Sequence, residues 1–196
     1  MDILQDELYH IYNQGNNKEK LFYSEDDYLH YLKLFRKNVF PYCQVIAYCL
    51  MPNHFHFLIH TTEDSVKIRK AGHLQVSELS NGFRLLQSQY AQYINKQINR
   101  TGSLFRQRIK VKCMRDGEEH YGYTAFHYIH QNPIKALLVK RLEDWRFSSF
   151  PDYAGLRNGT LCNQQLAEIL IGFDKKNFVN ESYQNLDDKQ IKKIVF

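Results

Sequence analysis

The stretch MPNHFHFLIH contains two histidines separated by one residue, His54 and His56. Neutral imidazole is a common metal ligand, and alternate side chains of a β-strand point to the same face. On a strand these histidines could therefore bind one ion together, while Phe55, Phe57 and Ile59 pointed into the core. Taken alone, such a pair is more often a surface feature of a solvent-facing strand than a metal site.

Nucleotide hydrolysis is a second reading of the same stretch. The histidine-triad hydrolases carry a third alternate histidine, which here would fall on Leu58. His60 lies on the same predicted face and has no assigned role. The leucine argues against hydrolysis of nucleotides but leaves the metal pair intact.

Alternating basic residues form a second feature, in the run LFRQRIKVK. Its cations share one parity: Arg106, Arg108, Lys110 and Lys112. On a strand they would line one face at a spacing of roughly 6.5–7 Å, which approximates the repeat of an extended nucleic-acid backbone. Phosphate contacts of this kind give salt-dependent binding. The alternative is an edge strand that its charges protect from aggregation.

The run FHYIHQNP is the third feature. On a helix Tyr128 and Asn132 would be neighbours one turn apart. A tyrosine can attack phosphorus as a nucleophile, and an amide oxygen could complete a metal site begun by two histidines. Tyr93 and Gln97 have the same spacing, and most helical tyrosines are packing residues, so the spacing alone carries little weight.

The elements that must position these residues follow from hydrophobic periodicity. Predicted strands span 9–13, 42–51, 54–62 and 103–114, and predicted helices span 24–38, 76–98 and 116–131. Ser24 and Asp27 form a capping-box pattern at the first helix. Pro133 should stop or kink the last of these helices. Residues 62–76 are polar and irregular.

This order of elements predicts an α+β fold of the ferredoxin-like type (split β-α-β, RRM-like). An antiparallel sheet would carry helices on one face and leave the other face free for a site. An additional C-terminal helical segment is expected beyond it. We divide the chain into a catalytic domain, 1–154, and a peripheral C-terminal extension, 155–196.

Composition is consistent with one globular protein. The chain has 196 residues, 43% of them hydrophobic, and a net charge of +5, which permits a polyanionic partner. Its four cysteines form no C-x-x-C pair. The N-terminus MDILQDELYH is unlike a signal peptide, and the longest apolar run, VIAYCLM, is too short to span a bilayer. A cytoplasmic location without membrane contact is therefore expected.

Together these stretches resemble the HUH single-tyrosine transposases, in particular the branch of REP-associated tyrosine transposases (RAYT), named for repetitive extragenic palindromes. The matching segments are YHIYNQGNN, AYCLMPNHFHFLIH, GSLFRQRIK, YIHQNPIKALLV and WRFSSF, in that order. The resemblance covers roughly residues 8–153 and does not reach the last forty or so.

The resemblance implies a transposase-like endonuclease and strand transferase. Such an enzyme cleaves and rejoins single-stranded DNA next to a hairpin through a 5′-phosphotyrosine intermediate. Carried over to this chain, Tyr128 is the nucleophile, and His54, His56 and Asn132 bind the metal.

The family suggests Mg²⁺ or Mn²⁺ as the divalent ion. Two imidazole ligands favour Mn²⁺ slightly, because Mg²⁺ prefers oxygen ligands. Single-stranded or hairpin DNA would be the partner, bound by the basic strand and by aromatic residues such as Tyr12. A homodimer is left open. The alternative is a domesticated, non-catalytic hairpin-DNA-binding protein.

Overall fold

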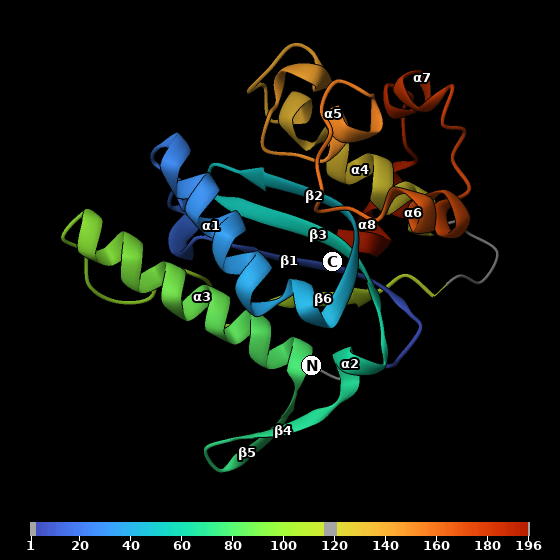
Figure 1. Ribbon diagram of the computed structural model, residues 1–196. Helices are drawn as coiled ribbons and strands as arrows, with labels where there is room; N and C mark the ends of the chain where they lie inside the picture. Colours follow the sequence, from blue (N-terminus) through green and yellow to red (C-terminus); the bar gives the residue numbers. More distant parts are fainter. Residues whose placement is uncertain (1–2, 116–120, 196) are drawn as a thin grey trace.

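The fold is that of a computed structural model, which describes residues 3–115 and 121–195. Its main sheet has four antiparallel strands in the order β2-β3-β1-β6 (Figure 1). These strands are β1 (Leu8–Gln14), β2 (Cys43–Met51), β3 (His54–Thr61) and β6 (Lys110–Cys113). The predicted α+β, ferredoxin-like arrangement is confirmed.

The remaining elements connect and cover this sheet. The longer helices are α1 (Glu25–Asn38), α3 (Glu78–Gln97), α4 (Tyr121–Lys135), α6 (Gln164–Ile171) and α8 (Asp188–Val195). Shorter elements are α2 (Glu63–Val66), β4 (Ile68–Ala71), β5 (Leu74–Ser77), α5 (Phe150–Tyr153) and α7 (Phe178–Ser182). Single 3₁₀ turns occur at Asn16–Lys18, Phe40–Tyr42 and Leu142–Asp144.

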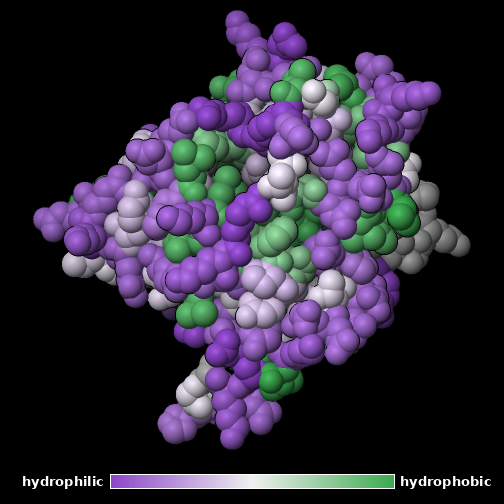
Figure 2. Space-filling view, in the orientation of Figure 1, coloured by the Kyte–Doolittle hydropathy of each residue, from purple (hydrophilic) through white to green (hydrophobic). Residues whose placement is uncertain are grey.

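Helices α1 and α3 cover one face of the sheet, as Figure 1 shows. The backbone N–H of Ser24 donates to Asp27 Oδ2 at 2.8 Å, so the predicted capping-box pair begins α1. Beneath the helices, Phe57 of β3 stacks on Phe35 with ring centroids 4.2 Å apart. Hydrophilic residues dominate the outer surface seen from this side in Figure 2. The alternation in β3 thus gives it a core face, as predicted.

A conservative substitution tests this core face. Ile59 of β3 is fully buried between Tyr9 and Val45. We expect Ile59→Val to lower the free energy of unfolding by about 1 kcal/mol, because it removes one buried methylene. The same change at Ile68, which is 64% exposed, should cost less than about 0.5 kcal/mol. Equal effects in urea denaturation would contradict the assigned core.

The opposite face of the sheet is not free, which corrects the prediction of helices on one face only. Helix α4 packs against β2 and β3, and the C-terminal helices pack around α4. A second hydrophobic cluster fills the space between them, with Leu58, Phe126 and Phe178 fully or almost fully buried. Leu58 therefore belongs to a core although it shares a face with the histidines. The sequence pattern of β3 did not indicate this, because the other residues on that face are the histidines His54, His56 and His60.

The C-terminal residues, predicted to be peripheral, complete that second core. Phe173, Phe178 and Ile194 are each at most 8% exposed and belong to the cluster around α4. Their aromatic and aliphatic side chains bury apolar surface that α4 would otherwise expose. The boundary between 154 and 155 stays a prediction, but the segment beyond it is not peripheral.

Two local expectations need correction, and two others concern the ends of the last predicted helix. The strand predicted over 103–114 is regular only in β6, and the chain before Lys110 is irregular apart from one bridge between Phe105 and Gly15. Residues 62–76 contain the short helix α2 and most of the β4–β5 hairpin, which extends away from the body in Figure 1. The predicted start of the last helix at 116 lies outside the described residues. Pro133 lies inside α4, which ends two residues later.

Within residues 3–115 and 121–195, every helix is too short or too polar to cross a membrane.

Candidate active site

Strands β1 and β3 and helix α4 surround a cavity of about 510 Å³, which most of the candidate residues line; Asn132 and Lys112 do not. Cross-strand pairing places His56 opposite Tyr12 and His54 opposite Gln14, so these side chains share a face. Helix α4 lies over that face and contributes Tyr128. The complete lining is Tyr12, Asn13, Gln14, His54, His56, Arg106, Arg108, Lys110, Tyr128 and Val195.

Tyr128 lies with its ring against the histidines. Its centroid is 5.7 Å from that of His56 and 6.3 Å from that of His10, both edge to face. Burial raises the pKa of Tyr128, and the neighbouring Tyr12 adds to the effect. The phenol is therefore protonated at neutral pH, so its proton must leave before or during any attack by the oxygen.

Asn132 links the tyrosine to the histidine strand. Its Nδ2 donates to the backbone carbonyl of Tyr128 at 2.9 Å, one helical turn away. Hydrogen bonding to Asn132 also affects two titrations, lowering the pKa of Tyr128 and raising that of His54. In both residues burial is the larger cause. The predicted trio of His54, Tyr128 and Asn132 thus meets in space.

A chain of hydrogen bonds indicates which ring nitrogens carry protons. His10 Nδ1 lies 3.0 Å from the carbonyl oxygen of Ile194, which can only accept, so His10 is protonated there. His10 Nε2, 2.9 Å from His56 Nδ1, must then accept from it. His54 Nδ1 lies 2.7 Å from Asn53 Oδ1 and donates to it. Both His54 and His56 therefore leave Nε2 unprotonated, with a lone pair that can bind a cation.

These tautomers are the form that metal ligation requires. Burial lowers the pKa of His54 to about 4 and that of His56 below its usual range, so both rings are neutral at pH 7. The described residues contain no group of three or more histidine, cysteine, aspartate or glutamate side chains arranged for a metal. Two imidazoles and the Asn132 amide are a neutral set, which fits a divalent cation whose charge a phosphate would balance.

His10 is a functional candidate that the sequence pattern did not single out. It is fully buried on β1, opposite Leu58, and its ring stacks on that of His56 with centroids 5.0 Å apart. The run YHIYN did hold a signal, because His10 and Tyr12 alternate as His54 and His56 do. The pair His10 and Tyr12 lies beside the pair His54 and His56 only because β1 pairs with β3, and the sequence alone did not predict that pairing.

The basic residues divide into two groups. Arg106, Arg108 and Lys110 line the cavity, whereas Lys112, opposite His10 on the same face of the sheet, is exposed outside it. The side-chain amide of Gln14 turns its oxygen towards the Arg106 guanidinium, and this oxygen accepts from Arg106 Nε at 2.9 Å. The predicted single row of four cations is therefore wrong, because the strand is regular only from Lys110 onward.

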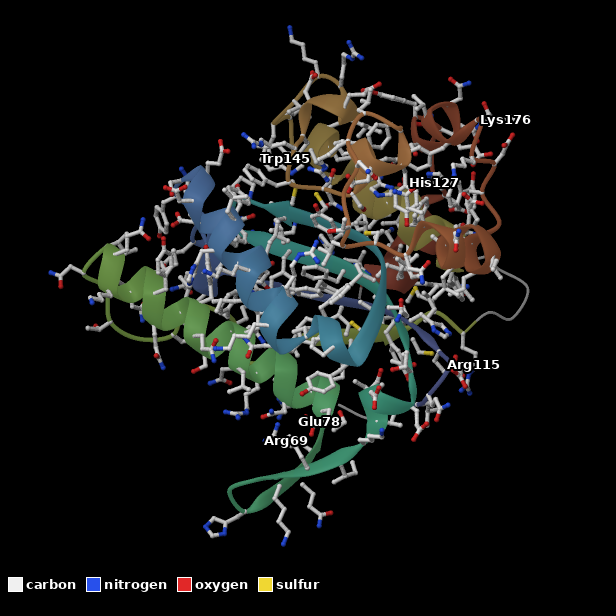
Figure 3. The ribbon with its side chains drawn as sticks, in the orientation of Figure 1. Arg69, Glu78, Arg115, His127, Trp145 and Lys176 are labelled. Atoms are coloured by element: carbon white, nitrogen blue, oxygen red, sulfur yellow. The ribbon has the colours of Figure 1, made fainter. Side chains whose placement is uncertain are left out.

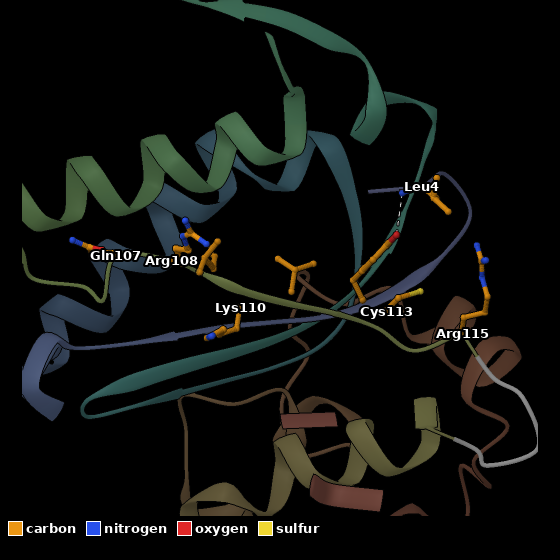
Figure 4. Close-up of a pocket in the computed structure, with 9 residues that line it drawn as sticks. Leu4, Gln107, Arg108, Lys110, Cys113 and Arg115 are labelled. Atoms are coloured by element: carbon orange, nitrogen blue, oxygen red, sulfur yellow. Dashed lines mark hydrogen bonds between the residues drawn. The ribbon is translucent and has the colours of Figure 1, made fainter. Parts of the chain in front are cut away.

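The basic segment also borders a second, more open cavity of about 1000 Å³ along the free edge of β6. Figure 4 shows Lys110 on the side of α4 and Arg108 on the side of α3. Both residues line both cavities, so the two cavities share two cations.

Helix α8 closes one wall of the first cavity. Val195 lines it, and the Tyr12 hydroxyl donates to the Val195 carbonyl. Thr124 of α4 donates to Gln190 at 2.7 Å, which ties α8 to α4. Tyr12, predicted to stack on bases, thus holds the C-terminal helix in this structure.

Comparison with known proteins supports the resemblance drawn from the motifs. No family model matches the chain. A Haemophilus influenzae protein assigned as a REP-associated tyrosine transposase is 29% identical over 111 residues, which cover 55% of this chain and 58% of that protein. The chain thus spans less than two thirds of that relative.

A solved structure, that of a REP-associated tyrosine transposase bound to a REP hairpin, has a similar fold. Its TM-score is 0.57 at 18% identity, over 80% of this chain and 86% of that one. The resemblance to this group and the fold class are therefore confirmed.

Proposed function

We propose that this chain is a DNA strand transferase of the REP-associated tyrosine transposase type. It would cleave and rejoin single-stranded DNA next to a hairpin, with Tyr128 as the nucleophile. The observation that carries the proposal is the meeting of Tyr128 with His54, His56 and three cations in one cavity. These residues come from three separate parts of the chain, and a packing tyrosine would need neither the unprotonated Nε2 atoms nor the cations beside it.

The chemistry exchanges one phosphodiester for another. The Tyr128 oxygen forms a bond to phosphorus, and the bond from phosphorus to the 3′ oxygen of the preceding nucleotide breaks. The phenol proton leaves, and the departing 3′ oxygen takes up a proton. Because the phosphotyrosine keeps an ester bond, attack by a 3′ hydroxyl reverses the step without ATP.

His54, His56 and Asn132 are the residues that would hold a divalent ion, Mg²⁺ or Mn²⁺. When bound, the ion supplies Lewis-acid stabilisation to a non-bridging phosphate oxygen. The nitrogen ligands favour Mn²⁺ over Mg²⁺ on softness. The neutral charge of the ligand set predicts that the ion binds more tightly when DNA is present.

Arg106, Arg108 and Lys110 would bind the phosphates on either side of the cleavage site. They border the cavity and continue towards the edge of β6. The solved relative is bound to a REP hairpin, and we propose a hairpin DNA as the partner of this chain as well. A homodimer and a cytoplasmic location stay predictions.

Incubation with labelled single-stranded hairpin DNA tests the proposal. We expect a covalent protein–DNA product with Mn²⁺ or Mg²⁺ and none with EDTA. Mass spectrometry of the digested product should locate the phosphoester at Tyr128. Binding without a covalent product under all these conditions would favour the non-catalytic hairpin-binding protein instead.

The salt dependence of DNA binding tests the basic residues. Replacing Arg108 and Lys110 together by glutamine should weaken binding. It should also make the slope of log affinity against log salt concentration less steep by about 1.4, because each phosphate contact on a single strand contributes about 0.7 to that slope. Replacing Lys175 and Lys176, which lie on the C-terminal segment, should change the slope little. An unchanged slope in the Arg108/Lys110 variant would assign these cations to protection of the β6 edge.

A further inference from the structure

The segment Trp145–Ser149 follows α4 in the chain but lines neither cavity of the site. It pairs with the outer edge of β2, the terminal strand of the sheet. Leu50 N–H donates to the Phe147 carbonyl at 2.9 Å, and Ser149 N–H donates to the Tyr48 carbonyl at 2.9 Å. The Trp145 indole, beside the end of β2 in Figure 3, donates to the Leu50 carbonyl at 3.1 Å. The segment is thus fixed to the sheet.

Ser149 connects this fixed segment to α4. Its hydroxyl oxygen accepts from the Tyr48 N–H at 3.0 Å and lies 2.8 Å from Nε2 of His130. It also lies 3.3 Å from the Tyr48 carbonyl, to which it can donate. All three bonds form only if His130 Nε2 carries the proton and donates to Ser149. His130 Nδ1 then stays unprotonated, which agrees with its lack of a partner among the described residues.

His130 occupies the position between the two site residues of α4. It is two residues from both Tyr128 and Asn132, so it points about 200° away around the helix. It is fully buried, packed edge to face against Phe126, Phe150 and Phe178. A bond on this side restrains the rotation of α4 and its height over β2.

We propose that His130 and Ser149 are positioning residues, which hold α4 so that Tyr128 and Asn132 meet the histidine strand. The inference rests on the proposed function for its catalytic consequence. Side-chain positions at a reacting centre matter strongly, because a displacement of about 1 Å can cost about 100-fold in rate. The bond would thus act on the rate of attack and leave DNA affinity largely unchanged.

The chain provides a matched control on the same helix. His127 is also fully buried and also bonds a serine, with Nδ1 3.0 Å from Ser182 Oγ. Ser182 belongs to α7, however, so this bond joins α4 to the C-terminal segment and not to the sheet. Figure 3 shows His127 among the C-terminal helices. Loss of either bond should destabilise the protein, but only one should displace Tyr128.

The experiment compares four full-length variants: His130→Leu, His130→Gln, Ser149→Ala and His127→Leu. For each we would measure thermal unfolding, the dissociation constant for hairpin DNA and the single-turnover rate of covalent attachment. We expect His130→Leu and Ser149→Ala to slow attachment about 10–100-fold, with DNA affinity changed less than about threefold. His130→Gln, whose Nε2 can still donate to Ser149, should recover most of the rate, and His127→Leu should keep it.

Fluorine NMR reports the position of Tyr128 independently of catalysis. With 3-fluorotyrosine at position 128, His130→Leu and Ser149→Ala should shift or split the resonance that the parent and His127→Leu share. Equal rates for His130→Leu and His127→Leu, with unchanged resonances, would overturn the inference. If the parent protein forms no covalent product, the proposed function fails, and the fluorine resonances alone decide whether His130 positions α4.

Discussion

Tyr128→Phe is expected to reduce covalent attachment of single-stranded DNA by about 10⁴-fold or more, as removal of a covalent nucleophile does in other enzymes. The substitution deletes only the hydroxyl oxygen. The phenyl ring can keep its packing against His56 and His10 and its place under the Lys135 ammonium, whose Nζ lies 5.3 Å from the ring centroid. DNA affinity and thermal stability should therefore change little, and gel separation of the covalent product measures the loss.

Tyr93→Phe is the matched control. Tyr93 and Gln97 repeat the spacing of Tyr128 and Asn132, but they lie on α3, which covers the other face of the sheet. There Tyr93 stacks on His30 with ring centroids 4.0 Å apart. Covalent attachment should be unaffected by this change. A product formed by Tyr128→Phe, or lost in Tyr93→Phe, would show that the nucleophile is another residue.

The pair Tyr93 and Gln97 also shows what local patterns can and cannot predict. Periodicity placed both tyrosines on helices and both histidines on one face of β3, because those properties depend on neighbours in the sequence. It could not tell which helix lies on the histidine face. The helix on the histidine face is determined by the sheet order and by which apolar surfaces pack together. At the level of sequence, only the order of motifs in the family that the chain resembles distinguished the helix of Tyr128 from that of Tyr93.

The other face of the sheet illustrates the same limit. Leu58 lies between His56 and His60 on its face of β3, so the local pattern does not predict that it is buried. It is buried because α4 and the C-terminal helices, which are distant in the sequence, pack over it. The irregular chain before Lys110 is a different case. Its alternation is that of a strand, but the regular ladder between β6 and β1 runs only from Lys110 to Cys113. Before Lys110 the run meets the end of β1 only around the bridge between Phe105 and Gly15.

His10→Phe is expected to weaken Mn²⁺ binding about 10–100-fold, the range typical when a residue that orients a metal ligand is lost. Phenylalanine fills most of the same space but cannot accept from His56 Nδ1. His56 would then lose the bond that keeps its proton on Nδ1 and its Nε2 lone pair free. Electron paramagnetic resonance of free Mn²⁺, with and without hairpin DNA, measures the change.

The control for this prediction is His30→Phe, the same substitution on α1, where the ring stacks on Tyr93 away from the cavity. It should leave Mn²⁺ affinity unchanged. His10→Gln should recover part of the affinity, because its amide oxygen can accept from His56. Equal affinities in the parent and His10→Phe would refute the role of His10, whereas absence of Mn²⁺ binding in the parent would refute the metal site itself. The bond from His10 to the Ile194 carbonyl makes α8 part of the same arrangement, so the orientation of His56 on β3 depends on a helix from a distant part of the sequence.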